Sequence, residues 1–382
     1  MKMKKFLFIT LVLLFINKDY LAQDQKFDSL ITAGVEQIYS IQFDEARSTF
    51  AIVKRDYPQH PAGNFFDAMI TWWQILLNLD NEEYDDLFED QLELVIDQCD
   101  DILDNNPKDI DAYFFKGGSL GFRGRLSAIR GDWFDAAADG KDALPLVFTA
   151  YELDSTNVDV KLGFGIYDYF ADVIPEKFPM VKPLMLLFPE GDKKKGIKEL
   201  QTVAQRGKYA KYEAQYFLMT LNYTFERNDK ECLKYAKMLS NKFPDNPRFQ
   251  SFLGRINVRM NNLPTAVEIF KDVLDKANKN LVGYNDKIKR EALYYIGLNY
   301  MRSDSLDMAT KYFKECENIS RKVDDDEESG FLINTVLYLG EIHDLKGERD
   351  KAIKNYEEVL DFREFGNSHD RAEEYMENPY RQ

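Results

Sequence analysis

Histidine and cysteine are scarce in this chain, which has three of each among 382 residues. No histidine stands at a metal-ligand spacing from a cysteine or another histidine, so the sequence predicts no zinc site. An odd, scattered set of cysteines gives no disulfide framework. The chain also lacks a Gly-Lys-Ser/Thr phosphate loop, and Gly163 and Gly165 lack the third glycine of a dinucleotide motif. We therefore expect neither a metal nor a cofactor.

One motif, Gly117-Gly118-Ser119-Leu120-Gly121, spells the G-x-S-x-G of a hydrolase nucleophile elbow. That elbow requires a strand, a strained turn and a helix, with a histidine and an acid beside the serine. Here Gly117, Gly121 and Gly124 recur at helical spacing, which favours close helix packing. A hydrolase that uses Ser119 is kept as an alternative, and we expect the protein not to be an enzyme.

Positive charge is also in short supply, because 50 Lys and Arg residues face 66 Asp and Glu residues, for a net charge of −16. An acidic chain without a basic stripe argues against nucleic-acid binding. Residues 80–111 hold fourteen acids against Lys108 alone. The simplest interpretation is a solvated face, and the alternative is a docking surface for a basic partner or cations.

The amino-terminal segment has the order of a secretory signal peptide. Lysines precede the apolar run Phe6–Ile16, and Ala22 follows before the chain turns polar. The run is well short of the roughly 20 residues that a spanning helix needs, which leaves a membrane anchor as the weaker interpretation. No cysteine precedes Cys99, which excludes lipid attachment at a new amino terminus. We expect residues 1–22 to be removed and the mature chain to be periplasmic or secreted.

A helical repeat is the most informative feature of the sequence. Over residues 247–366 a glycine, an alanine and an aromatic residue each recur 43 residues apart, at Gly254, Gly297 and Gly340, at Ala266, Ala309 and Ala352, and at Phe270, Phe313 and Tyr356. Numbered within each unit, these sets fall at places eight, twenty and twenty-four. Places four, seven, eight and eleven make one face of a first helix, and places twenty, twenty-four and twenty-seven make one face of a second. The unit is predicted to be an antiparallel helical hairpin.

Small residues at places eight and twenty let the two helices cross closely, since larger side chains would push their axes apart. This pattern resembles the tetratricopeptide repeat (TPR), with a small residue at eight, Ala at twenty, an aromatic at twenty-four and Pro at thirty-two. The register also matches upstream, at Thr220, Cys232, Ala236 and Pro244 and again at Gly34, Ala46, Phe50 and Pro58. The resemblance implies an all-α, right-handed superhelical solenoid of about eight TPR-like hairpins.

The regularity of the copies changes along the chain and suggests its domains. We expect TPR units with an acidic segment over 23–109, irregular units over 110–212, regular units over 213–366 and a fraying tail over 367–382. Residues 110–220 resemble a group of uncharacterised bacterial exported TPR proteins, a resemblance that implies a fold and no chemistry. It is carried by Gly131-Asp132-Trp133, Gly140-Lys141, Glu152-Leu153-Asp154, Gly163-Phe164-Gly165-Ile166-Tyr167, Gly191-Asp192 and Gly196-Ile197.

Two local features follow from the repeat register. Cys99, Cys232 and Cys316 fall on packing places of second helices, so we expect small buried residues rather than redox or metal roles. The longer units exceed the 34-residue spacing by nine residues. We expect this surplus to lengthen helices over Asn278–Arg290 and Arg321–Asn334, with the acidic run Asp324–Glu328 solvated at a turn.

TPR proteins usually bind partners on a concave face lined by first helices at places two, five, nine, twelve and thirteen. In this chain those places hold arginines beside aromatic and apolar residues. Arginine forks and aromatic faces suit an acidic or extended peptide, and ordinary ion pairs along the groove are the competing interpretation. The candidate partner-binding residues are Arg248, Arg255, Arg259, Tyr294, Leu298, Arg302, Phe217 and Leu221.

An apolar, proline-rich segment over residues 171–192 interrupts the irregular units. Long insertions of this kind are usually functional or mobile. The segment either folds back over an exposed groove or helix end, or touches a partner or a membrane. The sequence thus predicts an exported TPR scaffold that binds a protein or peptide in its concave groove. The alternative is an envelope-associated component that contacts a membrane or a membrane protein through residues 171–192.

Overall fold

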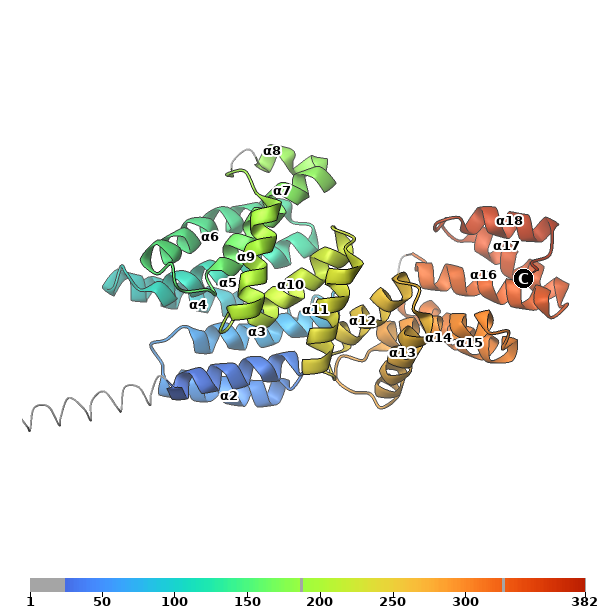
Figure 1. Ribbon diagram of the computed structural model, residues 1–382, viewed down its shortest axis with the longest axis horizontal. Helices are drawn as coiled ribbons and strands as arrows, with labels where there is room; N and C mark the ends of the chain where they lie inside the picture. The colour runs from blue at the N-terminus through green and yellow to red at the C-terminus, as the bar shows by residue number, and fades with distance from the viewer. Residues whose placement is uncertain (1–24, 186–187, 325–326, 382) are drawn as a thin grey trace, which may run out of the picture. The chain divides into compact units, whose positions relative to one another are not determined.

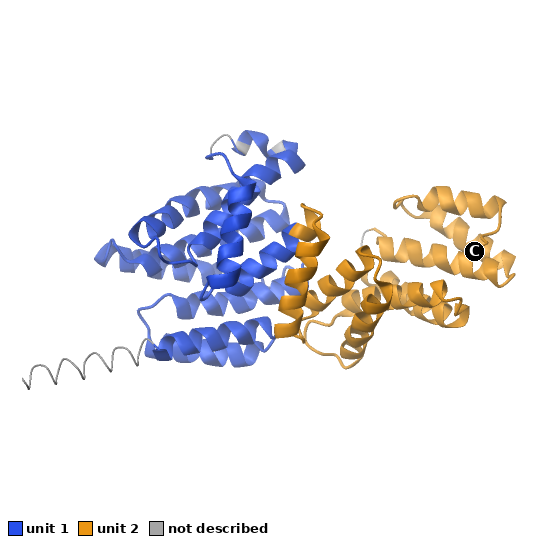
Figure 2. Ribbon diagram, in the orientation of Figure 1, with its two compact units in different colours: residues 1–221 blue, residues 222–382 orange. Residues whose placement is uncertain are grey.

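The computed structural model describes residues 25–185, 188–324 and 327–381, and these residues form helices and connections with no strand among them (Figure 1). They divide into two compact units, residues 1–221 and 222–382 (Figure 2). The boundary predicted between 23–109 and 110–212 therefore falls inside unit 1. Unit 1 contains a helix over residues 25–39, α2 Phe43–Asp56, α3 Ala62–Leu77, α4 Asp85–Asn105, α5 Ile110–Arg130, α6 Trp133–Leu153, α7 Lys161–Lys177, the 3-10 turn η1 Pro179–Val181, α8 Lys182–Met185, α9 Lys193–Arg206 and most of α10 Lys211–Thr224.

Unit 2 continues the same pattern of alternating helices. Leaving aside the short α8, the helices make eight successive pairs in chain order before a final single helix. The predicted all-α fold of about eight TPR-like hairpins is confirmed, while the handedness of a superhelix stays a prediction. The helices of unit 2 are α11 Asp229–Lys242, α12 Pro247–Arg259, α13 Leu263–Asn278, α14 Asp286–Arg302, α15 Leu306–Val323, α16 Gly330–Leu345, α17 Arg349–Asp361 and α18 Ser368–Glu377.

The contact between place eight and place twenty-four explains how each hairpin of unit 2 closes. The ring at place twenty-four lies directly over the glycine at place eight, so that a Cβ built on Gly254 would be 2.5 Å from Cζ of Phe270. The corresponding distances are 2.9 Å between Gly297 and Phe313 and 2.5 Å between Gly340 and Tyr356. Any side chain at place eight would therefore displace the buried ring. The predicted close crossing is confirmed, and the aromatic ring is what requires the glycine.

The nine surplus residues of the longer units are shared between helices and connections. Four residues, 243–246, separate α11 from α12, whereas seven, 279–285, separate α13 from α14. The remaining surplus lengthens α13 at its end and α14 at its start, so the helix extension expected over Asn278–Arg290 is only partly correct. In the next connection the acidic run was expected to be solvated. Glu327 is exposed, and Asp325 and Asp326 lie outside the described residues. Asp324 departs from the expectation, because its side chain is only 9% exposed and accepts a hydrogen bond from Arg290 at 2.5 Å.

Contacts between the two ends of unit 1 are not predicted by the repeat register. The Tyr209 hydroxyl donates to Asp28 at 2.7 Å, and the Tyr212 hydroxyl donates to Glu36 at 2.7 Å. The helix over residues 25–39 and the start of α10 therefore lie side by side, although more than 170 residues separate them in the sequence. In a simple solenoid each hairpin would contact only its neighbours, so unit 1 departs from that scheme.

A buried polar cluster fastens α10 inside unit 1. Glu213 accepts hydrogen bonds from the Tyr39 hydroxyl and from Arg125 of α5, both at 2.8 Å. The Arg125 guanidinium also lies over the rings of Trp72 and Phe217, 4.8 and 4.4 Å from their centroids. Because a buried charge needs a partner with good geometry, this cluster specifies where α10 packs. The inner side of the first helices of unit 1 is occupied by the unit's own last helix.

The apolar insertion is folded against unit 1, which was the first of its two interpretations. Residues 171–177 belong to α7 rather than to a loop. Phe178 then packs against Trp133 of α6 with ring centroids 5.8 Å apart, and the Phe188 ring meets Gly140 of α6. The Tyr167 hydroxyl of α7 donates to the Pro189 carbonyl at 2.6 Å. The described residues that follow α7 in this segment thus contact both α6 and α7.

The structure describes the carboxyl-terminal tail of the chain but not the predicted signal peptide, because residues 1–22 lie outside the described residues. At the other end, α18 and the residues after it pack on α16 and α17, with Tyr380 against the cluster that includes Met301 and Phe313. The fraying expected for 367–382 is therefore not what the described tail does. No helix in the described ranges is long and apolar enough to cross a membrane.

Candidate functional site

The candidate site lies on the first helices of unit 2, which are α12, α14 and α16. Polar residues begin each of them, because Asn246, Asn285 and Ser329 accept hydrogen bonds from backbone N–H groups of the first turn. Such caps satisfy donors that the helix itself leaves unpaired and fix where it starts. The caps therefore set the register that brings places five, nine and thirteen of successive helices onto one face, which we call the inner face of unit 2.

Arg255 serves the packing of successive hairpins rather than an open groove. Its Nε and Nη2 donate to the two carboxylate oxygens of Glu291 at 2.5 and 2.6 Å. Glu291 stands at place two of the next unit and is only 2% exposed. The carboxylate raises the pKa of Arg255 above its usual range. A bidentate pair of this kind is rigid and nearly neutral as a whole, so the competing interpretation of ordinary ion pairs holds for Arg255.

Arg259 is also engaged within unit 2. Its Nη1 donates to the Tyr223 carbonyl at 2.8 Å, its Nη2 lies 2.6 Å from Asp229, and its guanidinium stacks 4.1 Å from the centroid of the Tyr223 ring. Arg248 is partly buried near the start of α12 and also has partners. The arginines at these three positions therefore do not form an unpaired cationic surface as the sequence suggested.

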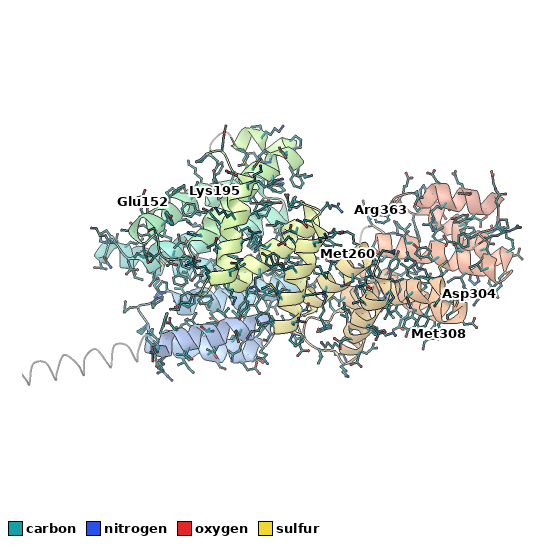
Figure 3. All side chains as sticks on the ribbon, viewed as in Figure 1. Glu152, Lys195, Met260, Asp304, Met308 and Arg363 are labelled. Carbon is teal, nitrogen blue, oxygen red and sulfur yellow. The ribbon has the colours of Figure 1, made fainter. Side chains whose placement is uncertain are left out.

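Tyr294, Leu298 and Arg302 of α14 form a different group. Tyr294 and Leu298 are partly buried and pack against the same apolar cluster as Tyr338 of α16. The rings of Tyr294 and Tyr338 have centroids 6.1 Å apart. Burial raises the pKa of Tyr294 well above its ordinary value, so its hydroxyl stays a neutral hydrogen-bond donor. Arg302 is exposed, and within the described ranges it forms no ion pair; Figure 3 marks Asp304, two residues beyond it.

Phe217 and Leu221 belong to unit 1 and are not surface residues. Phe217 is 4% exposed and Leu221 is 1% exposed. Phe217 packs against the Arg125 guanidinium and the Phe170 ring. Their assignment to an open groove is wrong, because α10 is the helix that fills the inside of unit 1. Of the eight candidate residues, the structure brings Tyr294, Leu298 and Arg302 together along α14, with the first two partly buried and Arg302 exposed.

Sequence reasoning missed the residues that close the far end of the inner face. Arg371 of α18 pairs with the buried Glu341 of α16 and lies over the Tyr338 ring. Asp344, one turn further along α16, accepts hydrogen bonds from Arg349, the Tyr356 hydroxyl and the backbone N–H of Tyr380. The sequence does contain a signal for these contacts, because Glu341 and Asp344 stand at places nine and twelve of α16. A buried carboxylate without a partner is costly at such positions, so a cationic partner could have been expected.

The other motifs have packing roles. Ser119 lies within α5 and is fully buried, so the sequence around it does not form a strand, turn and helix. Gly117 and Gly124 face α6 closely, whereas a Cβ on Gly121 would meet nothing within 4 Å, so only two of the three glycines serve helix packing. The cysteines are all buried as predicted, and burial raises their pKa values to about 12, 12 and 11 for Cys99, Cys232 and Cys316.

The histidines satisfy local partners. His343 contacts Glu348 at 2.6 Å with its side chain mostly buried, as expected for a satisfied core histidine. His60 accepts a hydrogen bond from the Ala62 N–H at the start of α3, and His369 lies 3.0 Å from the Phe362 carbonyl. Among the residues with described positions, no group of three His, Cys, Asp or Glu side chains could hold a metal ion.

Comparison with known proteins gives likenesses at low sequence identity. No protein-family model and no curated protein sequence matches the chain. Similar solved structures include Pseudomonas aeruginosa pilF, with 13% identity, 68% of this chain and 96% of that chain covered, and a TM-score of 0.44. Yeast Tom70 has 15% identity, coverages of 94% and 83%, and a TM-score of 0.39. A human IFIT1 dimer with m7Gppp-AAAA has 13% identity, coverages of 84% and 68%, and a TM-score of 0.41.

The assignment of the fold rests on the hairpins themselves. Successive helix pairs hold a glycine under a buried ring and an alanine at the crossing, at the places that the sequence register predicts. These contacts recur in three consecutive hairpins of unit 2. In its described residues this chain has the fold of a tetratricopeptide-type helical repeat protein.

Proposed function

We propose that the protein is an exported scaffold that binds a protein partner, and that it acts by binding rather than by catalysis. The observation that carries this proposal is the group formed by Tyr294, Leu298, Tyr338 and Arg302 on the inner face of unit 2. Tyrosine rings beside an exposed arginine are typical of interface hot spots. The fold offers such faces to extended segments and helices.

Fewer arginines of the inner face are available to an acidic partner than the sequence implied. Arg255 and Arg259 already neutralise acids of unit 2, which leaves Arg302 as the exposed cation of the group. We propose that an extended segment places apolar side chains on Tyr294 and Leu298 and one carboxylate against Arg302. A guanidinium binds a carboxylate through two parallel N–H donors, so one acidic residue at a fixed place would be selected rather than a long acidic run.

The test selects binding peptides from a library of random 12-residue peptides displayed on phage, with the mature chain as bait. We expect the selected peptides to share one acidic position and to lose binding to Arg302→Glu by about tenfold or more, since a charge-assisted pair becomes a repulsion. Lys314→Glu is the matched control, because Lys314 is exposed on α15, a second helix. Equal binding of the selected peptides to both variants would place the site elsewhere.

Contact with a membrane through residues 171–192 is the second candidate function. It is supported by Phe178, which is 38% exposed, and by the exposed Lys177 and Lys182 on either side. The rest of the segment gives less support, because its described residues belong to α7 or contact α6 and α7. Co-sedimentation with vesicles that contain anionic lipid tests this candidate, with Phe178→Ser as the variant. Binding that is weak and unchanged in Phe178→Ser would exclude it.

A further inference from the structure

Helix α4, the second helix of a hairpin in unit 1, has an uncovered acidic face. Its 21 residues include no lysine and no arginine. Side chains at spacings of four, three and four residues lie along one side of a helix. At these spacings α4 exposes three aspartates and a leucine, and the leucine is 55% exposed. We call this set the α4 stripe, and its members are Asp90, Leu94, Asp97 and Asp101.

The cations around α4 do not neutralise the α4 stripe. Those that α5 places beside α4 are paired with acids outside the stripe, in the pairs Lys116–Asp100, Arg123–Glu93 and Arg130–Asp85. Lys108 is exposed in the connection that follows α4. None of the described residues forms an ion pair with Asp90, Asp97 or Asp101. Because Asp97 and Asp101 are one turn apart, their like charges repel each other and favour a cationic neighbour.

Helix α11 of unit 2, which is also the second helix of its pair, has a cationic face with the same spacings. Three lysines and an asparagine are exposed four, three and four residues apart. A methionine beside them is 42% exposed. We call this set the α11 stripe, and its members are Lys230, Lys234, Lys237, Met238 and Asn241.

The acids near the α11 stripe do not cancel its charge. Asp229 already pairs with α12. Glu231 lies 3.0 Å from Lys234, and an exposed pair three residues apart on one helix contributes little. Lys230 and Lys237 form no ion pair with any residue that the structure describes. The α11 stripe therefore offers three cations where the α4 stripe offers three anions.

We propose that the α4 stripe of one copy of this chain binds the α11 stripe of a second copy. The ends of each stripe are eleven residues apart, which is about 17 Å at 1.5 Å per residue, so the two stripes match in length. With the helices antiparallel, the charged side chains meet in the pairs Asp101–Lys230 and Asp97–Lys234. The exposed Leu94 then lies beside Met238, whereas a parallel arrangement would place it opposite Lys234.

A second copy accounts for both stripes, whereas other occupants account for one. An anionic membrane surface is repelled by the α4 stripe. A divalent cation held between two α4 stripes, or a basic segment of another protein, would leave the α11 stripe uncovered. The equal spacing and the opposite sign of the charges therefore favour self-association.

The proposed contact does not involve the inner face of unit 2. Both stripes lie on second helices, and that face is made by the first helices α12, α14 and α16. The stripes are two different surfaces, so the contact is heterologous and copies join head to tail unless a ring closes. A contact between two helix faces is smaller than a standard interface, so we expect weak association that is detectable at about 100 μM.

The test measures self-association of the protein by sedimentation velocity up to about 300 μM in low salt, where attraction between exposed charges is strongest. One variant reverses the α4 stripe, with Asp90→Lys, Asp97→Lys and Asp101→Lys. A second variant reverses the α11 stripe, with Lys230→Glu, Lys234→Glu and Lys237→Glu. In the matched control three other lysines, exposed on the second helices α15 and α17, are replaced, with Lys311→Glu, Lys314→Glu and Lys354→Glu.

We expect the parent and the control to associate equally, and each reversal to weaken association by at least about tenfold. The two reversals shift the net charge in opposite directions, so a loss of association in both cannot come from net charge. An equimolar mixture of the two reversal variants should associate again. In that mixture the unchanged α11 stripe of one variant meets the unchanged α4 stripe of the other, and recovery shows that both variants are folded.

Several results would overturn the proposal. The first is a parent that stays monomeric at about 300 μM, or one whose association does not weaken as salt rises. The second is a loss of association in only one of the two reversal variants. The third is no recovery in a mixture of variants whose far-ultraviolet circular dichroism matches that of the parent. Loss of the parent's association in EDTA would instead assign the α4 stripe to a bridging divalent cation.

Discussion

Replacing Gly254 by alanine tests the packing rule on which the fold assignment rests. In the parent, the Phe270 ring lies between Gly254 on one side and the Tyr295 ring on the other, stacked at 4.8 Å. A Cβ on residue 254 would lie 2.5 Å from the Phe270 ring, so the ring must retreat by about 1 Å to reach ordinary contact. Tyr295 blocks that retreat.

The expected loss of stability follows from two opposing effects. Alanine favours a helix interior over glycine by about 1 kcal/mol. Overpacking a core that cannot relax costs about 1 to 3 kcal/mol, and the stacked Tyr295 places this site at the upper end. We therefore expect Gly254→Ala to lower the free energy of unfolding of unit 2 by about 2 kcal/mol.

Two further variants test whether the Phe270 ring, rather than alanine in place of a helical glycine, causes the loss of stability. In a Phe270→Leu background the flat ring is gone, so Gly254→Ala should be neutral or stabilising, which gives a coupling energy of about 2 kcal/mol. Gly121→Ala is the matched control, because Gly121 is helical and exposed with nothing within 4 Å of its Cβ position. It should stabilise unit 1 by about 0.5 to 1 kcal/mol.

The assay is urea unfolding of the protein together with native-state hydrogen exchange of the amides in α12 and α13. Hydrogen exchange is needed because repeat arrays do not unfold as one cooperative unit. If Gly254→Ala protects these amides as well as the parent does, or if Phe270→Leu fails to relieve the cost, the ring is not what requires the glycine and the packing argument is refuted.

Three other predictions concern charges that the structure buries. Burial raises the pKa of Glu341 to about 7 from its ordinary 4.5; the folded state therefore keeps a proton between those pH values that the unfolded state releases, and stability should fall as pH rises through that window. Glu341→Gln should flatten that fall in urea midpoints measured from pH 4.5 to 7.5, and an unchanged slope would contradict it. Arg255→Met leaves Glu291 buried and unpaired and should cost about 3 to 5 kcal/mol in urea unfolding, whereas Arg302→Met should stay within about 0.5 kcal/mol. Asp159 accepts three backbone N–H groups at the start of α10, so Asp159→Ala should cost about 2 kcal/mol and raise hydrogen exchange there.

The hairpin fold was predictable from the sequence because its causes are local. A glycine at place eight and a ring at place twenty-four are sixteen residues apart, and both belong to one hairpin. The cysteines on second helices were predictable for the same reason. Their burial follows from the periodicity of one helix, and no knowledge of distant contacts is required.

The closure of unit 1 could not be predicted in this way. The contact between Tyr209 and Asp28 joins residues 181 positions apart, and Tyr209 lies in the bend before α10, where helix periodicity predicts nothing. Periodicity describes the face of each helix but does not identify the helix that covers it. Phe217 and Leu221 were assigned to an open surface for this reason, because the rule that places them on the inner face holds only for an array that stays open.

The charges on the inner face of unit 2 distinguish the proposed binding group from the rest of that face. At place nine, Arg255 is paired with Glu291 on the following first helix, and Glu341 is paired with Arg371 on the helix after its own hairpin. Between these two pairs, place nine is Leu298, and no charge pair links α14 to α16 at that place within the described residues. A junction between successive first helices that buries an ion pair is rigid, and its charged side chains are not available to a partner. The junction of α14 and α16 has no such ion pair at place nine, and there partly buried aromatic rings lie beside an exposed arginine. A partner segment should therefore bind at the junction of α14 and α16.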